Sequence, residues 1–239
     1  MPPAERERAD DVQRFLSCSG GAPSRPVYDA LRVCHRMFKR FAITGGIACG
    51  KSLFSRELKR LGVEIRDADE VVHALEAPGG EAVAALRQRL GPGIVGADGG
   101  IDRRALGERV FRDDEARAAV NAVLHPLVRE QLLAWADTPG PRLKVAVIPL
   151  LFEAGWEKDW DVVICLVSRE AVQRERLMRS RGLTEEEARL RIAAQWPVAE
   201  KAARSHCVVH NEDDAAALAR EAGRVVRLLA ASRMDHGGT

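Results

Sequence analysis

Several features that would assign the chain to a class at once are missing from it. It contains no apolar run long enough to span a bilayer and no secretory h-region near Met1, so we expect a cytoplasmic protein with no membrane partner. Its five cysteines are odd in number and widely spread, and none forms a C-x-x-C pair. This pattern argues against a disulfide framework and a zinc site, and it favours a reducing compartment.

A strong excess of charge of one sign is also missing. The 37 basic and 35 acidic residues leave a formal net charge of +2, whereas a dedicated nucleic-acid binder usually carries a strong basic excess. The 239 residues, of which 46% are apolar, are enough to bury one substantial core and fit one or two domains. We therefore expect an ordinary globular protein that does not bind nucleic acid.

Residues 1–36 differ in composition from the rest of the chain. They combine charged residues with a stretch at 17–26 that is rich in small residues and holds two prolines. This composition predicts a mostly disordered extension with a short helix near 28–36. A transit peptide and a translation start at Met37 remain alternatives, and the early acidic residues argue against the first of them.

From Phe38 onward, short apolar segments alternate with amphipathic ones. Segments of these two kinds in alternation predict an α/β fold with a parallel sheet, and the Val- and Ile-rich middle strands indicate burial on both faces. An alanine-rich helix is expected at 215–231. The five strands are expected at 40–44, 63–66, 144–148, 161–167 and 206–210.

Two stretches interrupt this alternation. Residues 69–140 contain several helical segments and no convincing strand, and they include a helix capped by Asp102 and a helix that opens at Pro126. Residues 169–195 predict two helices, of which the second starts with a capping box at Thr184. Both stretches are therefore expected to be helical insertions into the sheet-forming core.

The strongest motif lies at residues 45–52, which read Gly-Gly-Ile-Ala-Cys-Gly-Lys-Ser and match G-x-x-x-x-G-K-[ST]. The glycines allow several backbone N–H groups to converge on one anion, and the dipole of the following helix favours the same anion. Lys51 supplies a cation for the β- and γ-phosphates, and the Ser52 hydroxyl can ligate magnesium. The motif predicts binding of ATP with magnesium. The alternative is a glycine-rich turn that only joins a strand to a helix.

Arginines are concentrated at 169–181. Guanidinium groups pair with phosphate oxygens, so we expect this segment to close over ATP as a lid, with Arg176 as the favoured contact. The alternative is a solvated basic helix face. The residues expected to contact ATP are Gly46, Ile47, Ala48, Cys49, Gly50, Lys51, Ser52, Leu53 and Arg176.

Asp67 and Asp69 follow the second predicted strand, at the sheet edge where open α/β sheets bind ligands. One of them is placed to accept a proton from an acceptor hydroxyl, and the alternative is that one simply caps the next helix. His73 lies one helical turn beyond Asp69, where it either contacts substrate or is an ordinary surface residue. His125 precedes Pro126 and is expected to cap the helix that opens there.

Two further residues have open interpretations. Glu153 is expected to end an apolar strand, where a buried carboxylate needs a partner. It either orders magnesium-bound water or forms a structural salt bridge. Cys49 is interpreted as a small filler within the loop, although a thiol beside a helix N-terminus is also expected to have some thiolate character.

Taken together, these motifs resemble dephospho-CoA kinase from about Phe38 to Leu229. The resemblance implies ATP-dependent phosphorylation of the ribose 3′-hydroxyl of dephospho-CoA, the last step of coenzyme A synthesis. It assigns the general base to Asp69 and suggests a substrate-side role for His125. We take Lys51 as the second catalytic residue, and Asp69, His73 and His125 are the expected substrate contacts. The matching segments are Thr44 to Ser52, Asp67-Ala68-Asp69, His125-Pro126, Pro149-Leu-Leu-Phe-Glu153 and Gly182-Leu-Thr184.

The resemblance also implies a P-loop kinase core with a five-stranded parallel sheet, a helical substrate domain and a helical lid. The kinase domain would cover 37–232, with the core at 37–68, 141–168 and 196–232, the substrate part at 69–140 and the lid at 169–195. Two departures from the family pattern stand out. Ala48 and Cys49 replace a Gly-Ser pair, and the lid reads Arg176 followed by Ser180, Arg181 and Gly182 instead of Arg-x-x-x-Arg-Asp-Gly.

Two other functions remain open. One is a different P-loop kinase of small molecules, such as a nucleoside monophosphate kinase, and the other is a non-catalytic nucleotide sensor. The presence of both Lys51 and Asp69 argues against the sensor. In each case the partner is a small molecule, and we expect a monomer or a weak homo-oligomer.

Overall fold

The computed structural model describes residues 39–140, 142–212 and 215–234. The extension predicted at 1–36 lies outside the described residues, and so does the short helix expected within it. The described residues form two compact units, one of which is Arg66–Thr138 and the other of which contains the residues before and after it. The segment expected to act as a lid belongs to the second of these units.

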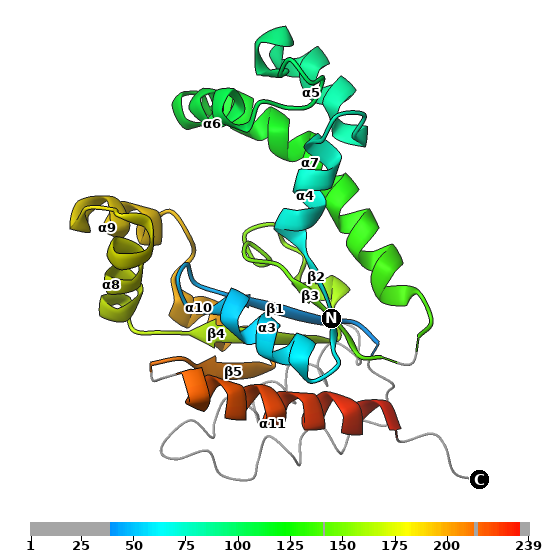
Figure 1. The fold of residues 1–239 in the computed structure, drawn as a ribbon, viewed down its shortest axis with the longest axis vertical. Coiled ribbons are helices and arrows are strands. Elements are labelled where there is room, and N and C mark those ends of the chain that lie inside the picture. The colour runs from blue at the N-terminus through cyan, green and yellow to red at the C-terminus, as the bar shows by residue number, and fades with distance from the viewer. Residues whose placement is uncertain (1–38, 141, 213–214, 235–239) are drawn as a thin grey trace, which may run out of the picture. The chain divides into compact units, whose positions relative to one another are not determined.

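A five-stranded sheet forms the centre of the larger unit, with the strand order β2-β3-β1-β4-β5 (Figure 1). Strand β1 pairs in parallel with β3 and β4, and β4 pairs in parallel with β5. The predicted α/β fold with a parallel sheet is confirmed, and each strand lies within one residue of its expected position. The strands are β1 (Phe41–Gly45), β2 (Glu64–Asp67), β3 (Lys144–Val147), β4 (Val162–Val167) and β5 (Cys207–His210).

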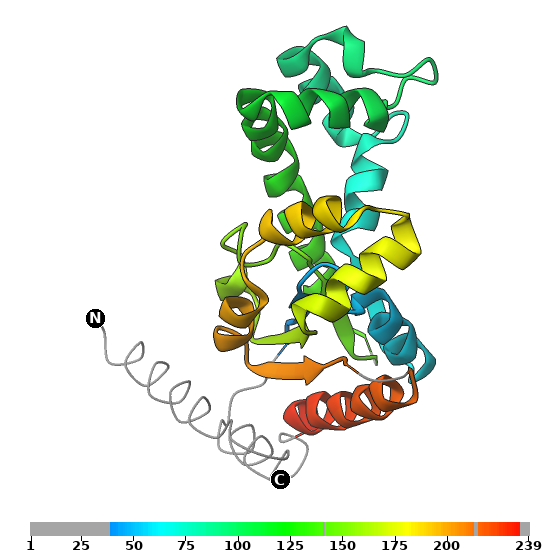
Figure 2. The same ribbon diagram turned by 90° about the vertical axis from the view of Figure 1, so that its left-hand side faces the viewer.

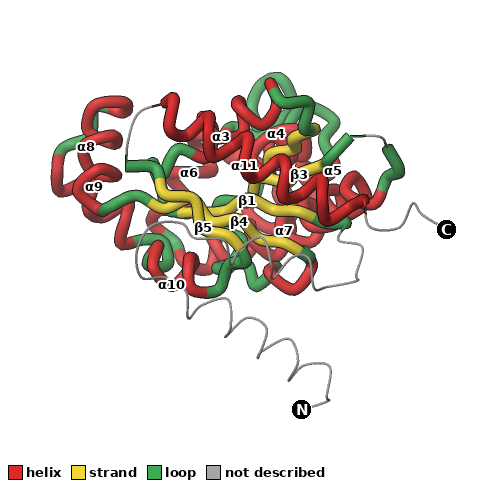
Figure 3. Tube along the Cα trace, turned by 90° about the horizontal axis from the view of Figure 1, so that it is seen from below, coloured by secondary structure: helices red, strands yellow, loops and turns green. Residues whose placement is uncertain are grey.

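Helices cover both faces of this sheet. Helices α3 (Lys51–Arg60) and α11 (Ala215–Met234) lie on one face, and α10 (Val198–Ala203) lies on the other (Figure 3). Phe54 and Leu58 of α3 share one buried apolar cluster with alternate residues of the central strands. Burial on both faces explains why β4 is a continuous apolar run, with every residue buried.

Helices α8 (Glu170–Arg181) and α9 (Glu185–Ala193) pack against each other as a hairpin (Figure 2, yellow). The predicted capping box is confirmed at the start of α9. The Glu187 backbone N–H donates to Thr184 Oγ1 at 3.3 Å, and the Thr184 N–H donates to the Glu187 carboxylate at 2.8 Å. A short 3-10 helix, η2 (Glu157–Asp159), lies between β3 and β4.

The unit Arg66–Thr138 is built from helices, as the sequence predicts for most of 69–140. The long helix α7 packs against α4, α5 and α6, and an isolated antiparallel bridge joins Val95 to Ile101. Asp102 caps α6 by accepting hydrogen bonds from two backbone N–H groups, which confirms that cap. The elements are α4 (Ala68–Glu76), α5 (Glu81–Leu90), η1 (Pro92–Ile94), α6 (Arg103–Arg112) and α7 (Asp114–Asp137).

The expected helix start at Pro126 is wrong, and so is the expected cap at His125. Helix α7 begins at Asp114, with Asp113 as its N-cap, and Pro126 lies inside it. An interior proline lacks the N–H that would bond one turn back, which costs roughly 3 kcal/mol. Burial of apolar residues on both sides of it, such as Leu124 and Val128, offsets this cost.

Within the described ranges, no helix combines the length and the apolar character needed to cross a membrane.

Candidate active site

The loop 45–52 lies between β1 and α3, and its backbone adopts conformations that favour glycine. Gly50 has a φ of 90° and is the N-cap residue of α3, and no described side chain caps that helix. No described side chain therefore competes with a ligand for the cap of α3. A helix N-terminus of this kind, preceded by a glycine-rich turn, is suited to bind phosphate.

Ala48 has a φ of 58°, and it is the one non-glycine residue with positive φ among those that the structure describes. Left-handed backbone costs an L-residue roughly 1–2 kcal/mol relative to its preferred conformations. Glycine would adopt this conformation without that cost. The Ala48 carbonyl oxygen accepts a hydrogen bond from Arg176 at 3.2 Å, and this contact helps to hold that conformation.

Lys51 opens α3 and reaches back across the loop. Its Nζ donates to the carbonyl oxygens of Gly45 at 3.0 Å and Gly46 at 2.8 Å. The ammonium group therefore lies over the glycines that precede the helix, and the Ser52 side chain beside it is exposed. This arrangement presents one cation and one hydroxyl at the helix start, and these are the groups that a nucleotide phosphate with magnesium requires.

Cys49 is fully buried, and burial raises the pKa of its thiol above the ordinary value even though the nearby Lys51 charge lowers it. The expected thiolate character is therefore wrong, because loss of hydration disfavours the charged form more than the ammonium group favours it. The interpretation of Cys49 as a filler fits its membership of the apolar cluster that contains Phe54.

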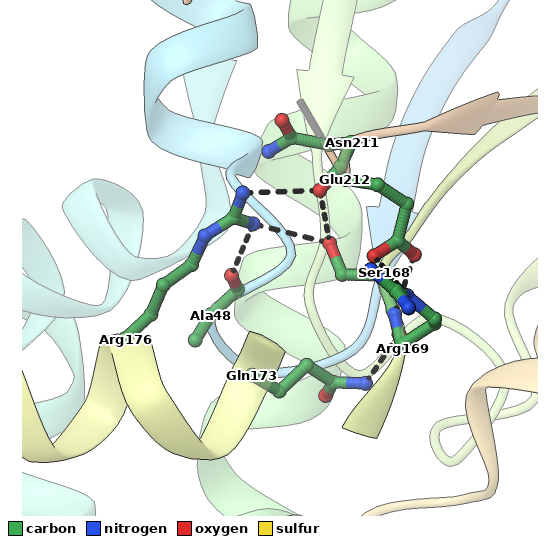
Figure 4. Close-up of polar contacts among 7 residues, drawn as sticks. All are labelled: Ala48, Ser168, Arg169, Gln173, Arg176, Asn211 and Glu212. Atoms are coloured by element: carbon green, nitrogen blue, oxygen red, sulfur yellow. Dashed lines mark hydrogen bonds and ion pairs between the residues drawn. The ribbon is translucent and has the colours of Figure 1, made fainter. Parts of the chain in front are cut away.

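Buried polar side chains from distant segments support the back of the loop. Asn211 Nδ2 donates to the Cys49 carbonyl oxygen at 2.9 Å, and the Asn211 carbonyl oxygen accepts from Ser168 Oγ at 2.8 Å. Gln173 Nε2 donates to the Ser168 carbonyl oxygen at 2.8 Å (Figure 4). On the other side, Gln195 Oε1 accepts from the Ile47 N–H at 2.9 Å.

Arg176 projects from α8 into this network (Figure 4). Its guanidinium group donates to the Ala48 carbonyl oxygen, to Ser168 Oγ at 3.1 Å and to the Asn211 carbonyl oxygen at 3.0 Å. The structure thus places Arg176 against the ATP loop, while its contact with ATP itself remains a prediction. Two other arginines of α8 form ion pairs, Arg174 with Glu170 and Glu185 and Arg179 with Glu175.

Of the two interpretations of Glu153, the structure shows the salt bridge. Glu153 lies in a turn several residues beyond β3, and its Oε1 is 2.6 Å from Lys201 Nζ. The same oxygen accepts from the Trp196 N–H at 3.1 Å.

In the helical unit, Asp67 is the residue that caps α4. Its Oδ1 accepts from the Asp69 N–H at 2.9 Å. Asp69 and His73 are exposed, in the first and second turns of α4. The cap is therefore Asp67, and Asp69 is an exposed residue that does not serve as the cap.

His125 is half-buried within α7, and burial lowers the pKa of its imidazole. A lowered histidine pKa favours the neutral ring at physiological pH. The neutral ring of His125 can donate one hydrogen bond and accept another. Its contact with the substrate remains a prediction.

Sequence reasoning did not identify Ser168, Gln195 and Asn211, which all contact the loop or its supports. Ser168 and Asn211 each follow a strand directly, β4 and β5, at the carboxyl ends where open α/β sheets bind ligands. Their position after a strand was the signal that could have identified them. Gln195 lies just beyond α9 and has no comparable signal.

A parallel sheet with β1 at its centre, followed by a glycine-rich loop and a helix that starts at a lysine and a serine, defines a P-loop kinase. The family model described as dephospho-CoA kinase matches residues 40–217. The chain belongs to the dephospho-CoA kinase family.

Several relatives of this chain are named dephospho-CoA kinase. It is 44% identical to the dephospho-CoA kinase of Geobacillus kaustophilus over 172 residues, which cover 71% of this chain and 86% of the relative. It is 43% identical to the dephospho-CoA kinase of Anaeromyxobacter dehalogenans over 198 residues, which cover 82% of this chain and 92% of the relative. Among solved structures, dephospho-CoA kinase from Campylobacter jejuni superposes with a TM-score of 0.65 at 26% identity, covering 82% of this chain and 99% of that one.

Proposed function

We propose that the chain transfers the γ-phosphoryl group of ATP to the ribose 3′-hydroxyl of dephospho-CoA, the final step of coenzyme A synthesis. The observation that carries the proposal is the loop 45–52, where the uncapped start of α3 and the Lys51 ammonium group meet. Membership of the dephospho-CoA kinase family supports the identity of the acceptor.

The loop residues have distinct roles in the proposed reaction. Backbone N–H groups at the start of α3 hold the phosphates, and Lys51 offsets the charge that develops between the β- and γ-phosphates. Ser52 would hold magnesium, which when bound neutralises phosphate charge. Arg176 and the lid 169–195 exclude water from the reacting groups.

Asp69 is the proposed general base. It accepts the proton of the ribose 3′-hydroxyl while that oxygen bonds to the γ-phosphorus and the bond to the bridging oxygen of ADP breaks. Its exposure in the first turn of α4 supports this role, because Asp67 already serves as the cap. His73 and His125, in the same helical unit, would contact the acceptor substrate.

The test is ATP consumption by the purified chain with magnesium, with and without dephospho-CoA. We expect ADP to form in equal amount to coenzyme A, with the new phosphate on the 3′-oxygen by mass spectrometry and NMR. Turnover with a nucleoside monophosphate instead would identify a different small-molecule kinase. ATP binding without turnover of any acceptor would identify a nucleotide sensor.

The proposal also includes a cytoplasmic location and a small-molecule partner, without nucleic acid. The location is supported by the free thiols of Cys49, Cys165 and Cys207, which suit a reducing compartment. Unchanged elution and activity in the presence of duplex DNA would agree with the absence of a nucleic-acid partner.

A further inference from the structure

Asn211 lies directly after β5, and its side chain is buried beside the ATP loop. Only 5% of the residue is exposed, and its own N–H donates to the Val167 carbonyl oxygen at 2.9 Å, which fixes its backbone to the end of β4. Its Nδ2 donates to the Cys49 carbonyl oxygen at 2.9 Å. The amide group is therefore held rigidly and bonded to the main chain of the loop.

The loop is also shaped to admit this amide. A Cβ at Gly50 would overlap Asn211 Nδ2, so the amide occupies the space that any other residue at position 50 would fill. Gly50 is therefore required for two reasons, its positive φ and its contact with Asn211. Such close complementarity indicates that the side chain and the loop are fitted to each other.

The hydrogen bond to Cys49 fixes the direction of the next N–H group. In a trans peptide the carbonyl group and the following N–H lie in the peptide plane and point in opposite directions. When Asn211 holds the Cys49 carbonyl, the Gly50 N–H must point away from Asn211, and it is one of the loop N–H groups expected to bind phosphate. A group that is pre-oriented in this way loses less entropy when its ligand binds.

Asn211 also connects the loop to the helical hairpin. Its carbonyl oxygen accepts from Ser168 Oγ and from Arg176, and Arg176 in turn donates to the Ala48 carbonyl oxygen (Figure 4). Two successive loop carbonyls, those of Ala48 and Cys49, are thus held by side chains that meet at Asn211.

We propose that Asn211 is a positioning residue for ATP, which acts by holding the Cys49–Gly50 peptide in its phosphate-binding orientation. The inference rests on the proposed function only in taking ATP as the ligand of the loop. Because the loop holds the nucleotide alike before and during phosphoryl transfer, loss of this contact should weaken ATP binding and leave kcat nearly unchanged.

The experiment compares two variants of the full chain with one control. Asn211→Ala removes the amide group. Asn211→Leu keeps the branched shape of the side chain but has no N–H donor in place of Nδ2. Glu212→Gln is the control, since Glu212 is the adjacent residue and bonds to Arg169 instead of to the loop. Each variant is first shown to be folded by circular dichroism and thermal unfolding without ligand, and ATP affinity is then measured calorimetrically with magnesium.

We expect both Asn211 variants to bind ATP about tenfold more weakly, the loss of one buried hydrogen bond. The KM for ATP should rise by a similar factor, while kcat and the KM for dephospho-CoA change less than about threefold. Glu212→Gln should bind ATP as the wild type does.

Wild-type ATP affinity in a folded Asn211→Leu variant would overturn the proposal, because shape without the donor would then suffice. Equal weakening by Glu212→Gln would also overturn it, since the effect would not be specific to the loop contact. If the wild type itself binds no ATP, the proposed function fails first, and that result is distinct from both of the others.

Discussion

The ammonium group of Lys201 is completely buried and lies 2.6 Å from Glu153 Oε1. It also donates to the Pro149 carbonyl oxygen at 3.2 Å, the same atom that accepts from Thr44 Oγ1 at the end of β1. Glu153 Oε2 is buried and has no hydrogen-bond partner among the described residues. One ion pair therefore connects α10, the turn after β3 and the strand that precedes the ATP loop.

Lys201→Met should be strongly destabilising, because it leaves the Glu153 carboxylate buried without its counter-ion. Breaking one partner of a buried pair costs about 3–5 kcal/mol, whereas replacing both partners by apolar residues is often neutral. The free energy of unfolding in urea should show this loss for the single variant and a much smaller one for Lys201→Met with Glu153→Leu. A loss below about 1 kcal/mol in the single variant would show that the pair is solvated.

Lys51→Ala should abolish the stabilisation of the protein by its nucleotide. If the loop is functional, ATP with magnesium at a hundredfold excess over Kd raises the free energy of unfolding by roughly 2.7 kcal/mol. Thermal unfolding with and without ATP measures this shift. Lys59→Ala is the control, because Lys59 is exposed in the last turn of the same helix and should leave the shift intact. An unchanged shift in Lys51→Ala would contradict its phosphate role.

Asp69→Asn should reduce kcat and leave ATP affinity nearly unchanged, since an amide cannot accept the hydroxyl proton. Loss of a general base costs about 10²–10⁴ in rate, and phosphoryl transfer is expected toward the lower figure because its loose transition state needs little early deprotonation. The fold should survive because Asp67 is the cap of α4. Steady-state kinetics decide, with Glu70→Gln as the matched control on the same exposed turn. A change in kcat of only a few-fold would exclude Asp69 as the base.

Ala48→Gly should stabilise the protein or leave it unchanged. Relief of the left-handed backbone gains roughly 1–2 kcal/mol, and the freer unfolded chain costs roughly 0.4–1 kcal/mol, so the net gain is roughly 0–1.6 kcal/mol. Ala48→Val should act in the opposite direction, because a β-branched residue is strained at positive φ. Urea unfolding of the two variants measures the difference. A clear destabilisation by glycine would show that the φ of 58° is not strained.

The pH dependence of stability should contain a contribution from His206. Its Nδ1 accepts from the Val163 N–H at 3.0 Å, and burial lowers the pKa of the ring although Asp161 raises it in part. A protonated ring could not accept that bond. The contribution is therefore complete above the unfolded pKa of about 6.5 and is lost as pH falls below it, at up to about 1.4 kcal/mol per pH unit.

Unfolding free energies of the wild type and His206→Gln between about pH 5 and pH 8, the range in which a histidine titrates, test this sign. The difference between the two proteins should shrink as the pH falls. A difference that is constant over the whole range would mean that His206 does not titrate with folding.

The strands and the loop were predictable because their signals are local. Five apolar segments, each ended by polar or glycine-containing sequence, were enough to locate the five strands of the sheet. The loop 45–52 carries its chemistry in consecutive residues, and the capping box at Thr184 does the same for α9. Such patterns depend on neighbours in sequence, so one chain suffices to recognise them.

Tertiary contacts decided the features that were missed. Pro126 has the local signature of a helix start, but buried neighbours such as Leu124 and Val128 hold it within α7. Cys49 lies at a helix N-terminus, which favours a thiolate, but complete burial reverses the direction of its pKa shift. No local pattern predicts that Asn211 meets the Cys49 carbonyl, because the two residues are 162 positions apart.

The long sequence separation between the loop and its partners affects how the chain folds during synthesis on the ribosome. The hydrogen bond of the Ile47 N–H cannot form until Gln195, 148 residues later, has been synthesised. That of the Cys49 carbonyl cannot form until Asn211, 162 residues later, has been synthesised. At about 5–20 residues per second, Asn211 is synthesised roughly 8–32 s after Cys49. The nascent chain therefore contains the loop 45–52 long before Gln195 and Asn211, which bond to the loop, have been synthesised. Capture of ATP is therefore among the last abilities that the growing polypeptide acquires.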